Sequence, residues 1–309
     1  MRVLALTLGF VLLACAFGRA SSEALEVARV APGVYVHTGQ IAVASPQNAG
    51  DIANLSFVVG QRCVAIIDTG NTYAMGVALR AAVKTVTATP VCYVINTHDH
   101  PDHVFGNAAF RTAGVQFVGH KNLAPALAAR KENYERALER NLGPVAKGSV
   151  IVMPTVLVEH TLRLDLGGRA LDLKAWRTAH TDTDLTVEDE ASGTVWLGDL
   201  LFVRHVPVID GSIRGWMAVC EALRSLRFTH LVPGHGPVDP EWPQALDDQV
   251  RYLGNIATEV KAAIQAQQTL SETVEKSNLS EQHSWALFDE FNRRNVTAAY
   301  AELEWEEGT

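Results

Sequence analysis

The sequence predicts a mixed α/β fold, because short apolar runs of strand length alternate with longer stretches of helical periodicity from about residue 27 onward. Some of these runs are continuously apolar, which is typical of strands that are buried on both faces. Hydrophobic residues make up 48% of the 309 residues, enough to form a large core. No stretch is rich enough in Pro, Gly or Ser to mark a linker, so we expect a single domain over residues 27–309.

The first half of this domain predicts three strands, two helices and a loop. Leu55, Phe57 and Val59 alternate with their neighbours as in a strand with one buried face. The runs CVAIIDTG (63–70) and VCYVINTH (91–98) are apolar throughout and then end in polar residues, as interior strands do. The two helices and the loop, which contains Gly and Pro, are predicted over residues 74–87, 121–141 and 143–155.

The second half repeats this alternation. Three strand-like runs each carry a polar residue at or near their carboxyl end: LDLKAWRTAHT (171–181), GTVWLGDLLF (193–202) and THLVPGHG (229–236). Helices are predicted over 214–227 and 244–268, the second from an apolar stripe at spacings of three and four residues. Apolar residues between Trp285 and Leu303 predict one more helix, so helices over about 271–309 should extend the domain at its carboxyl end.

The amino terminus has the composition of a secretory signal peptide. Arg2 precedes an apolar run from Val3 to Phe17, and small residues surround Ala20, where we expect cleavage. The stretch Leu12–Cys15 resembles a lipoprotein cleavage motif, but Leu13 fits that motif poorly, so a lipid anchor is the less favoured interpretation. The apolar run is short for a membrane span. We therefore expect a signal peptide over residues 1–20 and a periplasmic or secreted mature protein.

Charge and cysteine content narrow the function further. The net charge of -8, with no face rich in Lys and Arg, argues against a nucleic-acid partner. The mature chain would keep Cys63, Cys92 and Cys220, each in an apolar segment, so buried thiols are the simpler interpretation. A Cys63–Cys92 disulfide would suit an oxidising compartment, and the sequence leaves this alternative open.

The strongest functional signal is NTHDHPDHVFGN (96–107), which contains three histidines and two aspartates between His98 and His103. The later strand-like runs add His180, Asp199 and His235. In layered α/β folds functional groups gather where strands end, so we expect these side chains to converge. Imidazole and carboxylate ligands suit zinc, and also iron or manganese. Seven such ligands imply two metals that share a ligand or a water.

Together these motifs resemble the metallo-β-lactamase superfamily. HDHPDH has the H-x-H-x-D-H form that marks the superfamily, and AHTDTD, LGDLLF and PGHG resemble its remaining ligand motifs in the right order. The resemblance extends over residues 27–270, nearly the whole mature chain. It implies a four-layer αββα sandwich, with two sheets between helical layers and the metals at one edge. The helices at the carboxyl end would extend this sandwich.

The resemblance also implies roles for individual residues. The first metal would be bound by His98, His100 and His180, the second by Asp102, His103 and His235, and Asp199 would bridge both. A zinc-bound hydroxide would be the nucleophile, with Asp102 as the catalytic residue that orients it and passes a proton to the leaving group. Asp68, in IDTG, resembles the family's carboxylate that supports the ligand loop without touching the metal. Arg204 and His205 follow Asp199 closely, and we consider them for substrate binding.

The predicted function is that of a hydrolase with two Zn²⁺ that cleaves an ester, thioester, lactone or similar acyl bond in a small molecule. Asp199 at the bridging position resembles the glyoxalase II and lactonase-type branches, whereas β-lactamases typically carry Cys or Ser there. The export signal and the stretches PVIDGSIRGW, VPGHGP and RRNVTAAYAELE resemble most the quinoprotein relay system zinc metallohydrolases. Three alternatives remain: a β-lactamase, a mononuclear iron persulfide dioxygenase, and a metal-stabilised accessory partner of a periplasmic quinoprotein dehydrogenase.

Overall fold

The structure, a computed structural model, describes residues 23–305, so the expected signal peptide lies outside the described residues. Within this range, seven strands form a first sheet in the order β1-β2-β3-β4-β5-β6-β7. The pairs from β1 to β4 are antiparallel and those from β4 to β7 are parallel, so the last four strands end at the same edge. The strands are β1 (Ala28–Ala31), β2 (Val34–His37), β3 (Leu55–Val59), β4 (Val64–Ile67), β5 (Val91–Ile95), β6 (Gln116–His120) and β7 (Val156–Val158).

Five further strands of the described chain form a second sheet in the order β12-β11-β10-β9-β8. β11 and β12 are parallel, and the other neighbours are antiparallel. The strands are β8 (Thr161–Asp165), β9 (Ala170–Ala175), β10 (Leu185–Asp189), β11 (Thr194–Phe202) and β12 (His230–His235).

The two sheets pack face to face through side chains that alternate along each strand. In β4, Ala65 and Ile67 belong to the apolar core between the sheets, whereas Val64 and Ile66 belong to a second core beneath α1 (Tyr73–Val86). The same two-sided burial corrects the prediction for β3. Leu55 to Val58 are all buried, because α1 covers the face of Leu55 and Phe57, and the second sheet covers the face of Val58, which was expected to be exposed.

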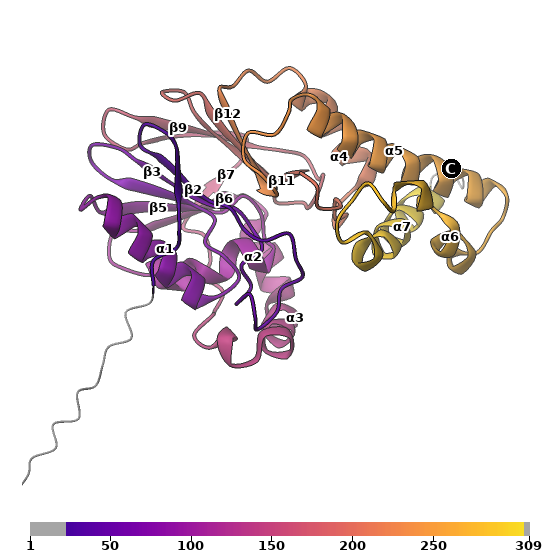
Figure 1. Ribbon diagram of the computed structural model, residues 1–309, viewed down its shortest axis with the longest axis horizontal. Helices are drawn as coiled ribbons and strands as arrows, with labels where there is room; N and C mark the ends of the chain where they lie inside the picture. Colours follow the sequence, from indigo (N-terminus) through magenta and orange to yellow (C-terminus); the bar gives the residue numbers. More distant parts are fainter. Residues whose placement is uncertain (1–22, 306–309) are drawn as a thin grey trace, which may run out of the picture.

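Helices cover both outer faces and complete four layers (Figure 1). On the side of the first sheet lie α1, α2 (Pro101–Val104) and α3 (Leu123–Leu142), and on the side of the second sheet lie α4 (Ile213–Leu223) and α5 (Gln244–Gln265). Short 3₁₀ helices span Phe105–Phe110, Gly143–Ala146 and Leu279–Glu281. α6 (Leu270–Lys276) and α7 (Phe288–Glu304) follow α5, and α7 shares the core of α4, α5 and β11. The predicted αββα sandwich with a C-terminal helical extension is confirmed.

A disulfide joins two neighbouring strands of the first sheet. Cys63, directly before β4, is bonded to Cys92 in β5, so the simpler interpretation of buried thiols is wrong for this pair. The parallel pairing of β4 with β5 brings the two Cα atoms to 5.7 Å, a distance that suits a disulfide. Cys220, in α4, is a buried free thiol.

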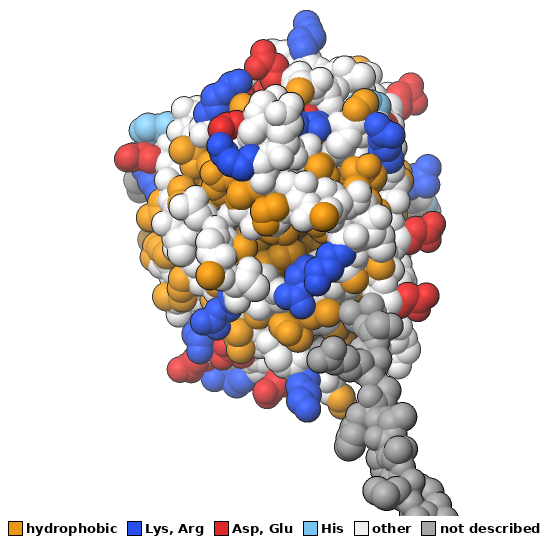
Figure 2. Space-filling view, turned by 90° about the vertical axis from the view of Figure 1, so that its left-hand side faces the viewer, with side chains coloured by type: hydrophobic (Ala, Val, Ile, Leu, Met, Phe, Trp, Pro, Cys, Tyr) orange, Lys and Arg blue, Asp and Glu red, His pale blue; other side chains and the backbone are white. Residues whose placement is uncertain are grey.

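The end of the sandwich away from α7 shows no surface of a single charge. In Figure 2, Lys and Arg side chains are interspersed with Asp and Glu around apolar side chains in the middle of this face. Of the helices that the structure describes, none combines the length and the apolar character needed to cross a bilayer.

Candidate metal centre

The seven predicted ligands converge at the edge where parallel strands of both sheets end. β5 ends at Ile95, and the chain turns from there into α2, which brings the cluster His98–His103 to this edge. β12 ends at His235, Asp199 lies within β11, and His180 lies in the loop between β9 and β10. Because strands position most of these segments, the side chains meet on a rigid frame.

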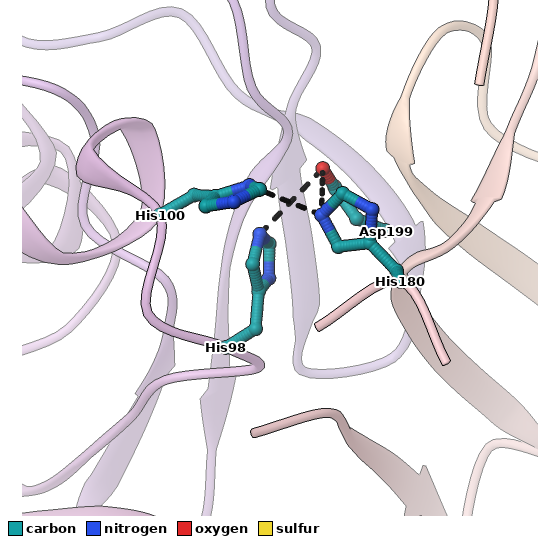
Figure 3. A group of neighbouring side chains, drawn as sticks. All are labelled: His98, His100, His180 and Asp199. Atoms are coloured by element: carbon teal, nitrogen blue, oxygen red, sulfur yellow. Dashed lines mark hydrogen bonds and ion pairs between the residues drawn. The ribbon is translucent and has the colours of Figure 1, made fainter. Parts of the chain in front are cut away.

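The first ligand group consists of His98, His100, His180 and Asp199 (Figure 3). Asp199 Oδ2 lies 3.3 Å from His180 Nε2 and 3.6 Å from His98 Nε2. His100 faces the same point through Nδ1, which lies 3.0 Å from His180 Nε2. Three imidazole nitrogens and one carboxylate oxygen therefore surround a common point, and these are ligand types that zinc binds.

The second ligand group consists of Asp102, His103 and His235. Asp102 Oδ2 lies 3.3 Å from His235 Nε2 and 3.6 Å from His103 Nε2. Asp199 also reaches this group, with Oδ1 at 3.3 Å from His103 Nε2 and Oδ2 at 3.4 Å from His235 Nε2. The position of Asp199 between the two groups is that of a bridging ligand.

Three buried atoms at this point are suited to bind a cation. His98 Nε2, His103 Nε2 and Asp199 Oδ1 are buried and have no hydrogen-bond partner within residues 23–305. Unpaired polar atoms of this kind are costly to bury. A cation that accepts their lone pairs would remove this cost, so the residues present fit a metal centre.

Each of the five histidines is held from behind through its second ring nitrogen, as metal-binding histidines commonly are. Two of the outer partners are carboxylates: Asp68 Oδ2 lies 2.8 Å from His103 Nδ1, and Asp210 Oδ2 lies 3.0 Å from His100 Nε2. The other three bonds join Nδ1 of His98, His180 and His235 to Thr97 Oγ1 (3.1 Å), the Val208 carbonyl (2.7 Å) and the Ile52 carbonyl (2.8 Å). These bonds hold the N–H on the outer nitrogen, so the inner nitrogen is the one that can offer a lone pair to a cation.

Asp68 lies where the sequence predicted it, and Asp210 was missed. Asp68 also accepts hydrogen bonds from the Thr97 backbone N–H (2.8 Å) and hydroxyl (2.7 Å), so it fixes the start of the ligand loop. Asp210 lies 110 residues from His100 in the sequence. It belongs to the stretch PVIDGSIRGW, which was noted as a family resemblance, but that stretch gave no indication that Asp210 contacts a ligand.

Burial and the neighbouring carboxylates shift the pKa values of these histidines in opposite directions. Burial lowers the pKa of His180 to about 3 and holds that of His98 well below its usual value, so both are neutral ligands. Burial also acts to lower the pKa of His235, but the Asp199 and Asp102 carboxylates outweigh it and raise that pKa to about 10. A cation that binds at His235 must therefore displace a proton.

Gly234 in the PGHG motif allows the bridging carboxylate to take its position. A Cβ atom at this residue would lie only 1.9 Å from Asp199 Oδ1. Any larger residue would displace the carboxylate, so this close approach requires a glycine before His235.

A cavity of about 440 Å³ opens at the ligands. Four of the ligands line it: His100, Asp102, Asp199 and His235. The remaining lining residues include apolar or aromatic side chains and two arginines: Tyr134, Phe202, Val208, Phe291, Arg130 and Arg294. An opening of this size suits a small-molecule substrate.

The structure separates the two residues considered for substrate binding. His205 lines the cavity at the ligands, with its ring centroid 5.1 Å from that of His235. Arg204 lines a different cavity of about 460 Å³, together with Arg251 and Trp285. The backbone turns sharply at Arg204, where φ is 65°, so the neighbouring side chains face different cavities. Arg204 is therefore not brought to the ligands.

The fold and the ligand pattern are those of a metal-dependent hydrolase class, and the comparisons agree. The sequence model of the metallo-β-lactamase superfamily matches residues 49–235, so the chain belongs to this superfamily, whose members are typically metal-dependent hydrolases. No curated protein matches the chain in sequence.

Solved structures share the fold at low sequence identity. A metallo-β-lactamase from Pontibacter korlensis is 20% identical, with a TM-score of 0.61, and the match covers 75% of this chain and 99% of that one. A stereoselective inverting sec-alkylsulfatase from Pseudomonas sp. is 16% identical, with a TM-score of 0.66, and the match covers 92% of this chain. The chain spans about half of the alkylsulfatase, 51% of its length. At these identities the likeness shows the fold alone.

Proposed function

We propose that this protein is a hydrolase that uses two Zn²⁺ to cleave an ester, thioester, lactone or similar acyl bond in a small molecule. The observation that carries the proposal is the position of Asp199, which reaches His180 of the first ligand group at 3.3 Å and His103 of the second at 3.3 Å. A carboxylate shared in this way suits two cations held about 3.5–4 Å apart.

The cations and the residues around them would have different roles in catalysis. When bound, the cations would activate a water at neutral pH and polarise the scissile carbonyl. We assign to Asp102, whose side chain is partly exposed to the cavity, the role of orienting that water and passing its proton to the leaving group. Phe202 and Phe291 give the cavity apolar walls, which lower the local polarity and strengthen electrostatic interactions beside them.

The choice of an acyl bond rests on the bridging residue. A carboxylate at position 199 is similar to the glyoxalase II and lactonase-type branches, whereas β-lactamases typically have Cys or Ser. The structural likeness to a metallo-β-lactamase and to a sec-alkylsulfatase adds β-lactams and sulfate esters as substrates to be tested. A single iron at the first ligand group would instead suit a persulfide dioxygenase.

Metal analysis followed by a substrate screen tests this proposal. The protein, purified without added chelator, should contain close to two zinc ions per chain by elemental analysis. It should then hydrolyse at least one member of a panel of thioesters, lactones, carboxylic esters, β-lactams and sulfate esters. One iron per chain with oxygen uptake on a persulfide would favour the dioxygenase and contradict the hydrolase.

We further propose that the protein works in the periplasm, within the quinoprotein relay group of the superfamily. The expected signal peptide supports export, and the Cys63–Cys92 disulfide suits an oxidising compartment. A periplasmic quinoprotein dehydrogenase is then the partner to test by affinity purification from a periplasmic extract. Stable co-purification of a dehydrogenase with a fully metal-loaded but inactive protein would favour the accessory role over hydrolysis.

A further inference from the structure

The segment of residues 203–212, between β11 and α4, holds two ligands of the first group from behind. We call this segment the support loop. Its Val208 carbonyl accepts a hydrogen bond from His180 Nδ1 at 2.7 Å, and its Asp210 carboxylate accepts one from His100 Nε2 at 3.0 Å. The backbone N–H of Asp210 also donates to the carbonyl of His180 at 3.1 Å. The support loop therefore sets the orientation of two of the three histidines at the first site.

The support loop is in turn held by α7, at the residues that flank Val208. Asn295, fully buried in α7, accepts a hydrogen bond from the backbone N–H of Ile209 at 2.9 Å. The Asn295 side chain also donates to the carbonyl of Pro207 at 2.6 Å. One amide thus fixes the backbone on both sides of the carbonyl that orients His180.

A second contact from α7 reaches the carboxylate that orients His100. Arg294 Nη2 donates to Asp210 Oδ1 at 3.0 Å, while His100 uses the other oxygen, Oδ2. Arg130, from α3, approaches Asp210 Oδ2 only to 3.8 Å. Arg294 is therefore the closer cation and fixes the plane of the carboxylate toward His100.

Contacts at both ends complete the attachment. Near the start of the support loop, the Val206 N–H donates to the carbonyl of Ala286, just before α7, at 3.1 Å. At its end, Glu302 in α7 accepts hydrogen bonds from the Ser212 hydroxyl and the Ile213 N–H, both at 2.8 Å. Asn295 and Glu302 are seven residues apart and so share one side of the helix.

Among the described residues, the support loop contacts the second ligand group through the N–H of Val203, which donates to the His235 carbonyl at 3.1 Å, and through the ring of His205, 5.1 Å from that of His235. Within the described chain, neither the loop nor α7 forms a hydrogen bond with a ring nitrogen of this group. Its histidines are held by Asp68 and by the carbonyl of Ile52, which lie at the end of β4 and before β3. Changes in α7 should therefore affect the two sites unequally.

We propose that α7 controls the metal affinity of the first site, with Arg294 and Asn295 as positioning residues that act through the support loop on His100 and His180. The C-terminal extension would then contribute to metal binding at the first site. This proposal rests on the metal binding, but not on the hydrolysis, of the proposed function.

The test measures the affinity of each site for zinc in the full-length chain. In a His235→Ala background only the first group is complete, and in a His180→Ala background only the second is complete. In each background we would compare Arg294→Gln with Arg293→Gln, a change at the neighbouring arginine, which pairs with Glu275 away from the support loop. The dissociation constant for zinc is obtained by competition with a chromophoric chelator.

We expect Arg294→Gln to raise the dissociation constant of the first site by about tenfold, the lower end of the effect of removing an outer partner of a metal ligand. The second site should be unchanged, and Arg294→Lys should restore part of the loss because it returns a cation to Asp210. Asn295→Ala should act in the same direction, with thermal unfolding measured alongside to confirm that the chain is folded.

Three results would overturn the proposal. Equal weakening of both sites by Arg294→Gln would indicate general destabilisation, and unchanged affinity at the first site would show that α7 has no influence there. Absence of zinc binding in the unsubstituted chain would refute the metal centre itself and, with it, the control by α7.

Discussion

At the scale of single residues, every histidine of the site directs one ring nitrogen toward the other members of its ligand group and the other toward a supporting group of the protein. The outer partner decides which nitrogen keeps its lone pair, so it acts on the metal without touching it. Asp68 supports the site in two ways. Its carboxylate accepts a hydrogen bond from His103 Nδ1 at 2.8 Å, and it accepts another from the backbone N–H of Thr97 at 2.8 Å.

The first prediction at this scale is that Asp68→Asn weakens the second metal site. Asn tolerates the left-handed backbone of residue 68, where φ is 57°, but it removes the charge that orients His103. The dissociation constant for the second metal should rise by about 10- to 100-fold, as measured by chelator competition. Asp172→Asn, at an exposed carboxylate on β9, serves as a control and should change neither site.

Asp102→Asn should lower kcat by at least about 100-fold, the usual contribution of a positioned acid or base. An amide keeps an oxygen for the metal but cannot accept a proton from the attacking water. The metal content must be determined in the same sample, because Asp102 is also a ligand of the second group. Full turnover with two metals bound would show that Asp102 has no part in the chemistry.

The residue scale also shows what the sequence could and could not predict. The seven ligands were predicted because their side chains recur in fixed motifs, such as HDHPDH and PGHG. The carbonyls of Ile52 and Val208 could not be predicted, because every residue carries a carbonyl and only the fold selects one. Arg204 was expected at the cavity of the ligands but lines another one. The backbone turn that redirects it, with a positive φ of 65°, leaves no clear signal in the sequence.

At the scale of elements, the apolar strands β4, β5, β11 and β12 were predicted well, and several short strands, β8 and β10 among them, were not. β4 and β5 are continuous apolar runs, which is a strong signal. β8, an edge strand of the second sheet, is largely exposed and rich in polar residues, so its sequence does not differ clearly from that of a loop. The register of β4 and β5 also decided the pairing of Cys63 with Cys92, which the sequence left open.

We predict that the double variant Cys63→Ser/Cys92→Ser is less stable by about 2–4 kcal/mol, because the disulfide closes a loop with a sequence separation of 29. Urea unfolding followed by circular dichroism measures this loss. A reducing agent should lower the stability of the unsubstituted protein and leave the double variant unchanged. Equal stability of the two proteins under oxidising conditions would contradict the prediction.

At the scale of the whole molecule, both sheets bring strand ends to one edge, where buried carboxylates and imidazoles balance each other's charge. In the metal-free site, burial opposes protonation of His103 and His235, but nearby carboxylates, Asp199 first among them, outweigh it. They hold the pKa of His103 well above its usual range and raise that of His235 to about 10. Both rings therefore carry protons at neutral pH and must lose them to become ligands.

Metal binding should consequently release protons, and the affinity for zinc at the second site should fall as the pH falls. Each proton displaced corresponds to about a tenfold loss of affinity per pH unit below the raised pKa values. Calorimetric titration at pH 7 in two buffers of different ionisation enthalpy measures the number released. A heat of binding that is identical in both buffers would mean that the histidines are already neutral.

The central claim is that four separate chain segments, 98–103, His180, Asp199 and His235, form one centre for two cations. It is tested most directly by a crystal structure of the zinc-loaded protein with anomalous diffraction recorded at the zinc edge. We predict two anomalous peaks per chain, one among His98, His100 and His180 and one among Asp102, His103 and His235, with Asp199 in contact with both. A single peak, or peaks away from these residues, would contradict the account.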